Sequence, residues 1–407
     1  MASFEIHGGK PLKGELIPQG AKNEALQVIC APLLTSEKVT ISNIPDIVDV
    51  NKLIGLMQAM GVKVEKVEKG TYIFQAKNVD LEYLQLEDFK IRASSLRGSV
   101  MIVGPMLARF GVGYLPKPGG DKIGRRRLDT HFAGMKMLGA AFNYDAGEHF
   151  YAVEGKKLKG TYIHMDEASV TGTANIVMAA VHAEGETVIY NAACEPYLQQ
   201  LCRMLNSMGA KIEGAGTSTI SIEGVSTLHG TSHRVPPDRI ETGTFLTAAA
   251  ATRGDITVLD TAPDFLHHVL GKLEQAGCKM ELGKDWIRLR TDGKRCKATN
   301  ITTAPYPAFP TDMQAQFMAL NTLAEGSATV VENIFENRFM HVAELQRMGA
   351  DIELQGHTAI VRGKERLQGA PVMATDLRAS ASLIIAGLAA DGETTIDRVY
   401  HLDRGYA

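Results

Sequence analysis

A glycine that follows an amphipathic stretch recurs along this chain of 407 residues at nearly constant spacing. Successive glycines of this kind lie 68 to 78 residues apart, and a short alternating segment such as 211-KIE-213 follows most of them. Because glycine has no Cβ, it adopts the left-handed conformation at the end of a helix at low cost. The sequence therefore predicts a repeating unit of roughly seventy residues, with one helix ending in each. The five predicted helix ends are Met60-Gly61-Val62, Leu138-Gly139-Ala140, Met208-Gly209-Ala210, Ala276-Gly277-Cys278 and Met348-Gly349-Ala350.

Each unit also contains a second, more apolar segment that is rich in alanine and ends in a small turn and a β-branched strand. Helices of this composition are usually buried on all sides. A β-α-β-α-β unit of this size is too large for a solenoid repeat, so we expect neighbouring units to build compact domains. Six units predict an α/β fold of two domains, each of three repeats, with helices inside and sheets outside. The segments are 174-ANIVMAAVHAEGETVIY-190, 244-TFLTAAAATRGDITVL-259, 314-QAQFMALNTLAEGSATVV-331 and 380-SASLIIAGLAADGETTI-396.

Interruptions of the repeat indicate where the two domains meet. Histidine, glycine and paired prolines break the pattern in 229-HGTSHRVPPDR-239. The strand 3-SFEIHG-8 precedes the first helix-forming segment, 22-KNEALQVICAPLL-34, and we expect it to pair with the second domain. The sixth unit begins at 392-GETTIDRVYHLDRGYA-407, and we interpret it as C-terminally truncated, without its second helix, glycine cap and last strand.

Composition excludes several classes of protein. A formal net charge of −3 argues against a nucleic-acid or membrane-surface protein. The five cysteines form no CxxC pair and no metal-ligand spacing, which predicts no metal site and suits a reducing cytoplasm. The N-terminus has no hydrophobic signal region, and apolar runs such as 99–108 are too short to span a bilayer. We expect a cytoplasmic protein.

The segment 116-PKPGGDKIGRRRLDTH-131 carries the clearest chemical signal. Glycines let the backbone approach a ligand closely, and guanidinium groups match phosphate and carboxylate oxygens two at a time. Asp121 lies among Lys122 and the run Arg125 to Arg127, which favours a proton donor to an anionic substrate. The alternative is a solvated basic loop.

Charged residues also stand where helices are expected to begin. Each alone is more often an N-cap than a catalytic group, but recurrence in nearly every repeat predicts an anion pocket at converging helix N-termini. No Walker loop, GxGxxG, HExxH or GxSxG motif is present, which argues against nucleotide hydrolysis, Rossmann redox chemistry and metalloproteases. We therefore expect a substrate with several phosphates or carboxylates. The charged residues are Lys22, Arg97, Asp238, Arg239, Asp312, Asp376 and Arg378, and the polar Asn23 stands next to Lys22.

A set of ordered motifs resembles the UDP-N-acetylglucosamine 1-carboxyvinyltransferases, the enolpyruvyl transferases that open bacterial peptidoglycan synthesis. The resemblance runs from Met1 to Ala407. It implies two inside-out α/β barrel domains of three repeats each: residues 21–235, carrying a mobile lid loop 114–126, and residues 1–20 plus 236–407. The motifs are GAKNEAL (20–26), PGGDKIGRRRLDTH (118–131), DRIETGTF (238–245), AFPTDMQAQF (308–317), FENRFMH (335–341), ATDLRAS (374–380) and HLDRGY (401–406).

The resemblance implies transfer of the enolpyruvyl group of phosphoenolpyruvate to the 3′-hydroxyl of UDP-N-acetylglucosamine, with release of phosphate. No cofactor, metal, nucleic acid or membrane is implied, and we expect a monomer. Lys22, Arg126 and Arg404 match the phosphoenolpyruvate clamp, with Arg97 nearby, and Asp312 matches the base at the sugar hydroxyl. The other implied substrate contacts are Asn23 at the sugar, Leu128, Asp129 and His131 at the uracil, Ser169 and Val170 at the diphosphate, Ile334 and Phe335 at the sugar wall, and Asp376 and Arg378 beside the reacting centre; we add Arg239.

Three features depart from the family pattern: the residues at positions 121 and 171, and the truncated C-terminus. Asp121 stands where the lid usually carries a proton-donating cysteine, the group that fosfomycin alkylates, so resistance is expected. Nearby cations favour the ionised carboxylate and bound phosphoenolpyruvate favours the protonated one, so Lys22 is the alternative donor. Thr171 replaces a common glycine, which leaves the diphosphate contact open. Arg404 lies close to the chain end, where termini commonly fray.

Other functions remain open at this point. The nearest is 5-enolpyruvylshikimate-3-phosphate synthase, but KNEAL at 22–26 replaces that enzyme's serine-rich segment. RNA 3′-terminal phosphate cyclase would need a nucleotidylated histidine in a matching motif, and no histidine here has one. A catalytically silent sugar-nucleotide binder should lack Asp312, Lys22 or Arg126, and all three are present. A chain too truncated to hold its second domain is the last alternative.

Overall fold

The computed structural model describes residues 3–117, 119–120, 123–145 and 150–406. Its contacts divide the chain into two compact units. Unit 1 comprises Met1–Gln19, Asp121–Arg125 and Pro236–Ala407, and unit 2 comprises Gly20–Gly120 and Arg126–Val235. Each unit has its own cluster of buried apolar side chains. The expectation that two domains fold with bounds 21–235 and 1–20 plus 236–407 stays a prediction.

The predicted glycine caps are confirmed. All five glycines have φ between 91° and 102°. The residue after each glycine donates its N–H to the carbonyl five positions earlier, as from Val62 to Met57 at 3.1 Å and from Ala350 to Leu345 at 3.1 Å. This is the Schellman arrangement, which satisfies carbonyls left unpaired at a helix end. The helices that end this way are α2 (Val48–Ala59), α5 (Asp129–Met137), α7 (Pro196–Ser207), α9 (His267–Gln275) and α11 (Val342–Arg347).

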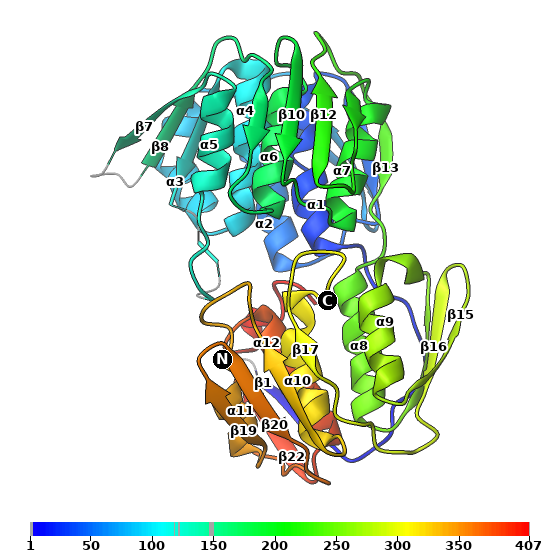
Figure 1. Cartoon of the computed structure of the whole chain (residues 1–407). Coiled ribbons are helices and arrows are strands. Elements are labelled where there is room, and N and C mark those ends of the chain that lie inside the picture. The colour runs from blue at the N-terminus through cyan, green and yellow to red at the C-terminus, as the bar shows by residue number, and fades with distance from the viewer. Residues whose placement is uncertain (1–2, 118, 121–122, 146–149, 407) are drawn as a thin grey trace. The chain divides into compact units, whose positions relative to one another are not determined.

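The alanine-rich segments form the buried helices. Every residue of α10 is buried, and α8, α10 and α12 contact one another within unit 1 (Figure 1). Small side chains allow this close approach, and the burial confirms the predicted all-round apolar environment. These helices are α6 (Val170–Ala180), α8 (Arg239–Ala251), α10 (Gln314–Leu323) and α12 (Leu377–Ala389).

Shorter helical segments complete the units. In unit 2 they are α1 (Lys22–Val28), η1 (Ala31–Leu34), η2 (Tyr83–Gln85), α3 (Glu87–Ser94), η3 (Arg97–Ile102) and α4 (Val103–Phe110). In unit 1 they are η4 (Pro263–Phe265), η5 (Thr311–Met313) and η6 (Val399–His401). No helix among the described residues is long and apolar enough to cross a membrane.

The sheets repeat one strand pattern, in which a parallel pair is extended by two antiparallel neighbours. In unit 2 the four-stranded sheets run β13 (Ser232–Arg234), β3 (Lys38–Ser42), β5 (Thr71–Gln75), β4 (Lys63–Glu68), and β9 (Tyr162–His164), β10 (Glu186–Tyr190), β12 (Thr219–Glu223), β11 (Lys211–Glu213). In unit 1 they run β2 (Lys13–Leu16), β14 (Asp255–Leu259), β16 (Trp286–Arg290), β15 (Lys279–Leu282), and β17 (Ile301–Thr302), β18 (Ser327–Val331), β20 (Thr358–Arg362), β19 (Asp351–Gln355).

Two sheets have three strands among the described residues. One is the antiparallel set β6 (Val112–Pro116), β8 (Phe150–Glu154), β7 (Ala141–Asp145), and the other is β21 (Pro371–Met373), β22 (Glu393–Asp397), β1 (Ser3–His7). In the latter, Ser3 lies opposite Asp397, so the N-terminal strand pairs with the last strand of unit 1. The expected pairing of segment 3–8 with the later part of the chain is confirmed.

Candidate active site

The predicted charged residues collect at the N-terminal ends of buried helices. In unit 2, α1 begins at Lys22 and η3 begins at Arg97. In unit 1, α8 begins at Arg239, and Asp312 lies in η5 directly before α10. The free N–H groups and positive dipole ends of helices favour anions at these positions.

In unit 2, Lys22 is held by an aspartate that the sequence analysis did not identify. Lys22 Nζ lies 2.8 Å from Asp49 Oδ2, and both side chains are almost fully buried. Asp49 lies in the first turn of α2. A buried ammonium needs a charged partner, because desolvation otherwise disfavours its protonated form. The only sequence signal for this pairing was that Asp49 stands at the start of the α-helix that follows the Lys22 motif.

Arg97 and Arg126 place two guanidinium groups close together. Arg97 Nη2 donates to the backbone carbonyl of Arg126 at 2.7 Å. A Cβ at Gly120 would meet Arg126 Nη1 at 2.9 Å and Arg97 Cβ at 3.2 Å, so glycine is what lets the loop pass between them. Burial and then the charge of Arg126 lower the pKa of Arg97 to about 10. Two adjacent cations in a half-buried setting are an anion-binding arrangement.

His131 is a bracing residue inside unit 2. The residue is 1% exposed, and its Nδ1 lies 3.1 Å from Asn175 Nδ2 while its Nε2 lies 3.1 Å from Thr171 Oγ1. Asn175 Nδ2 is a donor, so Nδ1 accepts and Nε2 carries the proton. Burial and then the charge of Arg97 lower the pKa of His131 to about 3. Both nitrogens are therefore occupied, and the implied uracil contact of His131 would require breaking one of these bonds.

The other implied nucleotide contacts lie at the starts of α5 and α6. Ser169 caps α6 by accepting the N–H of Gly172 at 3.2 Å, and Val170 opens that helix. Leu128 precedes α5, and the exposed Asp129 opens it. Asp129 Oδ2 accepts from Arg127 Nε at 2.7 Å. Thr171 leaves the α6 N-terminus intact, and its Oγ1 accepts the Nε2 proton of His131.

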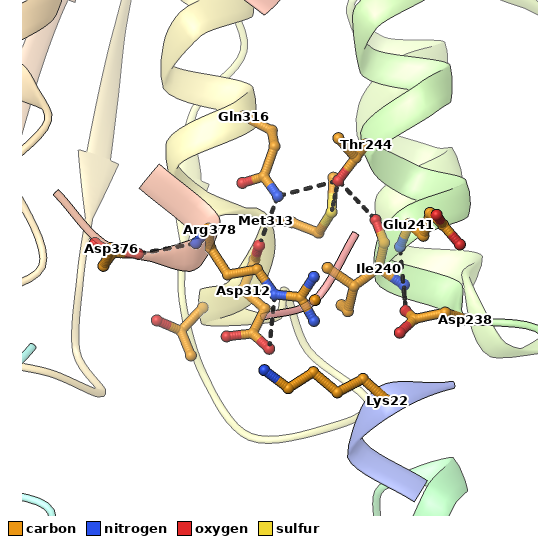
Figure 2. Close-up of polar contacts among 12 residues, drawn as sticks. Lys22, Asp238, Ile240, Glu241, Thr244, Asp312, Met313, Gln316, Asp376 and Arg378 are labelled. Atoms are coloured by element: carbon orange, nitrogen blue, oxygen red, sulfur yellow. Dashed lines mark hydrogen bonds and ion pairs between the residues drawn. The ribbon is translucent and has the colours of Figure 1, made fainter. Parts of the chain in front are cut away.

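In unit 1, Asp312 lies between two arginines. Arg338 Nη2 is 2.7 Å from Asp312 Oδ1. On the other side, Arg378 Nε is 3.6 Å from Asp312 Oδ2 (Figure 2). Arg338 and Arg378 are 7% and 5% exposed, whereas Asp312 is 25% exposed. Nearby cations favour the ionised carboxylate, which is the form that accepts a proton. Sequence reasoning missed Arg338, although it lies inside the FENRFMH motif.

Asp238 and Asp376 are N-caps, which was the simpler of the two sequence interpretations. Asp376 Oδ1 accepts the N–H groups of Arg378 and Ala379, each at 2.9 Å. Asp238 Oδ1 caps α8 in the same way (Figure 2). Asp376 therefore sets the direction of the helix that carries Arg378.

Two further groups belong to this region of unit 1. Burial and then Asp238 raise the pKa of Glu241 to about 7, and Glu241 Oε2 accepts the N–H of Gln19 at 2.8 Å. The guanidinium of Arg239 lies over the Tyr306 ring at 5.4 Å. Glu241 follows the predicted Asp238-Arg239 pair by two residues, which was its only sequence signal.

Ile334 and Phe335, the implied sugar wall, are held by hydrogen bonds from their backbone N–H groups to a buried carboxylate. Glu332 Oε1 accepts the N–H groups of Ile334 at 2.8 Å and Phe335 at 3.2 Å. The Phe335 ring lies 5.3 Å from the guanidinium of Arg338. Phe335 therefore lies next to the arginine that pairs with Asp312, within the same unit.

Arg404 lies in a held turn near the chain end. Gly405 N donates to Leu402 O at 2.9 Å, Gln19 Nε2 donates to Gly405 O at 3.3 Å, and the Tyr406 hydroxyl lies 3.3 Å from Thr244 Oγ1. The sequence suggested that this segment would fray, whereas in the structure these hydrogen bonds hold it. Asn23 is half-buried in α1, and Asp121 lies outside the described residues.

One cavity among the described residues lies away from these side chains. A cavity of about 400 Å³ in unit 1 is lined by residues at the C-terminal ends of α8, α10 and α12, including Ala251, Leu323 and Ala389, and by none of the predicted site residues. Among the described residues, only the exposed group Glu5, His7 and Glu393 brings potential metal ligands together, and none of these is a predicted site residue.

Comparison with known proteins identifies the family. Residues 6–407 match the family described as EPSP synthase (3-phosphoshikimate 1-carboxyvinyltransferase). UDP-N-acetylglucosamine 1-carboxyvinyltransferases of Coxiella burnetii strains Dugway 5J108-111 and RSA 493 are each 51% identical over 409 residues, which cover 100% of this chain and 92% of the relative. The chain belongs to the enolpyruvyl transferase family. The resemblance that the motifs carried is thereby confirmed.

Solved structures of enolpyruvyl transferases share the mixed α/β fold. The enolpyruvyl transferase NikO from Streptomyces tendae matches with a TM-score of 0.87 at 24% identity, covering 99% of this chain and 94% of that chain. EPSP synthase from Acinetobacter baumannii matches with a TM-score of 0.72 at 19% identity, covering 99% and 95%. These likenesses extend the family assignment to the arrangement of the fold.

Proposed function

We propose that this chain transfers the enolpyruvyl group of phosphoenolpyruvate to the 3′-hydroxyl of UDP-N-acetylglucosamine, the first committed step of peptidoglycan synthesis, in the cytoplasm. The observation that carries the proposal is the carboxylate of Asp312 between two almost fully buried arginines at the start of α10. Relatives named UDP-N-acetylglucosamine 1-carboxyvinyltransferase at 51% identity over the whole chain support the choice of acceptor.

The reaction needs a base, an acid and an anion clamp. The sugar oxygen attacks C2 of phosphoenolpyruvate and loses its proton to Asp312, while C3 receives a proton. C3 then loses a proton, the double bond returns, and the C2–O bond to phosphate breaks with the electron pair leaving on phosphate. Atoms and charges balance without a cofactor or metal. General acid and base catalysis of this kind contributes about 10²–10⁴-fold to a rate.

We assign the anion clamp to cations that match the family motifs. Lys22, Arg126 and Arg404 hold phosphoenolpyruvate, with Arg97 next to Arg126. The paired guanidinium groups of unit 2 and the buried Lys22 support this assignment. The remaining proposed contacts are Asn23, Arg239, Ile334, Phe335, Asp376 and Arg378 around the sugar and reacting centre.

The nucleotide is assigned to the helix starts of unit 2. The N-terminus of α6 at Ser169 and Val170 offers N–H groups to a diphosphate. Leu128 and Asp129 hold the uracil, and His131 acts through its bonds to Thr171 and Asn175.

Asp121 is proposed as the proton donor to C3, with Lys22 as the alternative. A carboxylate at the lid position is not alkylated as a cysteine is, so we expect fosfomycin resistance. Residues 123–125 of the lid loop 114–126 contact residues 336–337: Asn337 N donates to Ile123 O at 3.1 Å and Arg125 N donates to Glu336 Oε2 at 2.9 Å. Both hydrogen bonds lie within unit 1, to which Asp121–Arg125 belong.

We also propose the finer architecture. The repeated strand order and the buried helices support two inside-out α/β barrels of three repeats each. We expect these domains to correspond to residues 21–235 and to residues 1–20 plus 236–407, in a monomer.

The test is phosphate release from phosphoenolpyruvate with UDP-N-acetylglucosamine or shikimate 3-phosphate as acceptor, each with and without fosfomycin. Release with the sugar nucleotide alone, undiminished by fosfomycin, is expected. Release with shikimate 3-phosphate would favour the EPSP synthase activity named by the family description. Binding of the sugar nucleotide without phosphate release would indicate a silent binder.

A further inference from the structure

A buried carboxylate close to the Arg338–Asp312 ion pair accepts four hydrogen bonds. Glu332 is 2% exposed. Its Oε1 accepts from Thr303 Oγ1 at 2.9 Å and from the N–H groups of Ile334 and Phe335, and its Oε2 accepts from Thr311 Oγ1 at 2.8 Å. All four partners are donors, which suits a carboxylate that only accepts hydrogen bonds. The NH2 group of a glutamine at this position would face donors instead of acceptors.

Thr311 connects the Glu332 carboxylate to the ion pair of Arg338 and Asp312. Its hydroxyl donates its single proton to Glu332 and accepts from Arg338 Nη1 at 2.8 Å. Arg338 Nη2 in turn donates to Asp312 Oδ1 at 2.7 Å. The chain of contacts runs carboxylate, hydroxyl, guanidinium, carboxylate, and each link has its donor and acceptor determined.

We propose that Glu332 and Thr311 are positioning residues for the base, acting through Arg338 to determine which oxygen of Asp312 meets the sugar hydroxyl. This inference rests on the proposed function and deepens it. Because Thr311 gives its proton to Glu332, only its lone pairs face Arg338. The planar guanidinium is then held at two points, by Thr311 and by Asp312 Oδ1. Oδ2 remains on the side of Arg378, at 3.6 Å from Nε.

The charges of the relay alternate in sign along unit 1. Glu332 and Asp312 flank Arg338, and Asp312 stands between Arg338 and Arg378, two cations that face it among the described residues of unit 1. Removing one contact of Arg338 frees the guanidinium to turn and weakens its hold on Asp312. A shift of about 1 Å in a catalytic group can cost about a hundredfold in rate.

The test compares Thr311→Val, which keeps the shape and removes the hydroxyl, with Thr311→Ser, which keeps the hydroxyl. We expect Thr311→Val to lower kcat with UDP-N-acetylglucosamine by about tenfold to a hundredfold. The KM for the sugar nucleotide should change by less than about threefold. The acid limb of the kcat/KM profile should move to higher pH, because a loosened Arg338 stabilises the carboxylate less. Thr311→Ser should stay within about threefold of the unmodified enzyme.

Further variants separate the relay from general damage. Thr247→Val removes a buried hydroxyl bonded to Gly243 O at 2.7 Å in α8, and it should leave kcat and the pH profile unchanged. Glu332→Gln should reproduce the pH shift of Thr311→Val. In an Asp312→Asn background, Thr311→Val should change the residual rate by less than about threefold, because the relay acts through Asp312.

Two outcomes overturn the relay. One is a Thr311→Val enzyme with unchanged kcat and pH profile. The other is an equal loss in Thr311→Ser and Thr311→Val, which would make the hydroxyl irrelevant. Both leave the proposed function intact, since the unmodified chain still releases phosphate with the sugar nucleotide. Failure of the unmodified chain to release phosphate with any acceptor would instead reject the proposed function.

Discussion

Lys22 Nζ lies 2.8 Å from Asp49 Oδ2, with the two side chains 7% and 6% exposed. Asp49 thereby holds the ammonium group that we assign to phosphoenolpyruvate. Loss of one partner from a buried ion pair leaves an uncompensated charge, at a typical cost of about 3–5 kcal/mol. We expect Asp49→Asn to lower the free energy of unfolding by an amount in this range and to raise the KM for phosphoenolpyruvate, as measured by urea unfolding and steady-state kinetics.

The matched control for that change lies three residues earlier. Asp46 is exposed and accepts a hydrogen bond from Asn51 Nδ2 at 2.8 Å. Asp46→Asn should change unfolding by less than about 0.5 kcal/mol. Equal effects of the two substitutions would show that Asp49 does not hold Lys22 in the way described.

Gly271 within α9 and Gly277 just after it should respond to alanine in opposite directions. Gly277 has φ 92° and would give a new Cβ no neighbour within 4 Å, so only the left-handed conformation is penalised, by about 1–2 kcal/mol. Gly271 lies inside the helix with equally open space and should gain up to about 1 kcal/mol. Thermal unfolding of Gly277→Ala and Gly271→Ala measures both. A stabilised Gly277→Ala would contradict the cap.

The buried His341 should make the protein less stable in acid. Burial and then the charge of Arg338 lower the pKa of His341 to about 3, against about 6.5 in the unfolded chain. The unfolded state alone therefore binds this proton between these values, and stability falls as the pH drops below about 6.5. The loss amounts to about 2 kcal/mol at pH 5. His341→Leu should reduce by that amount the drop in unfolding free energy between about pH 7.5 and about pH 5.

Met348→Leu serves as the control for repacking at the same helix, because Met348 is fully buried and does not titrate. It should leave the pH dependence unchanged. If His341→Leu keeps the full acid sensitivity of the unmodified protein, His341 does not remain neutral in the folded state.

Asp121 should set a lower pH optimum than a cysteine at the same position. We expect the carboxylate to be ionised before substrates bind and protonated in the closed complex, because phosphoenolpyruvate disfavours a neighbouring negative charge. The kcat should therefore fall as the pH rises, and a kcat that stays flat between about pH 6 and about pH 9 would refute this. Asp121→Cys should shift the optimum upward and make the enzyme sensitive to fosfomycin.

Local features of this protein were predictable from the sequence. The glycine at each Schellman cap and the aspartates before α8 and α12 act within a few residues of their own positions. Their effect depends on backbone conformation and on a nearby N–H group, so it survives in any tertiary setting. The alanine-rich segments likewise predicted buried helices, and the ordered motifs indicated the family.

The partners of the site residues were decided by the tertiary structure. Asp49 meets Lys22 across 27 positions, and Arg338 meets Asp312 across 26. Nothing in the local sequence distinguishes either residue from a surface charge, because the choice of partner depends on how separate helices and turns pack. His131 shows the same limit: its motif suggested a ligand contact, whereas burial against Asn175 and Thr171 engages both of its ring nitrogens.

The sequence by itself thus determined where the five glycine-capped helices end and which charged residues stand at several helix starts. Tertiary structure alone decided which charges are buried, which are paired and which pKa values move. The physical reason is that capping and backbone preference act over a few residues, whereas desolvation and ion pairing depend on what the rest of the chain places around each group.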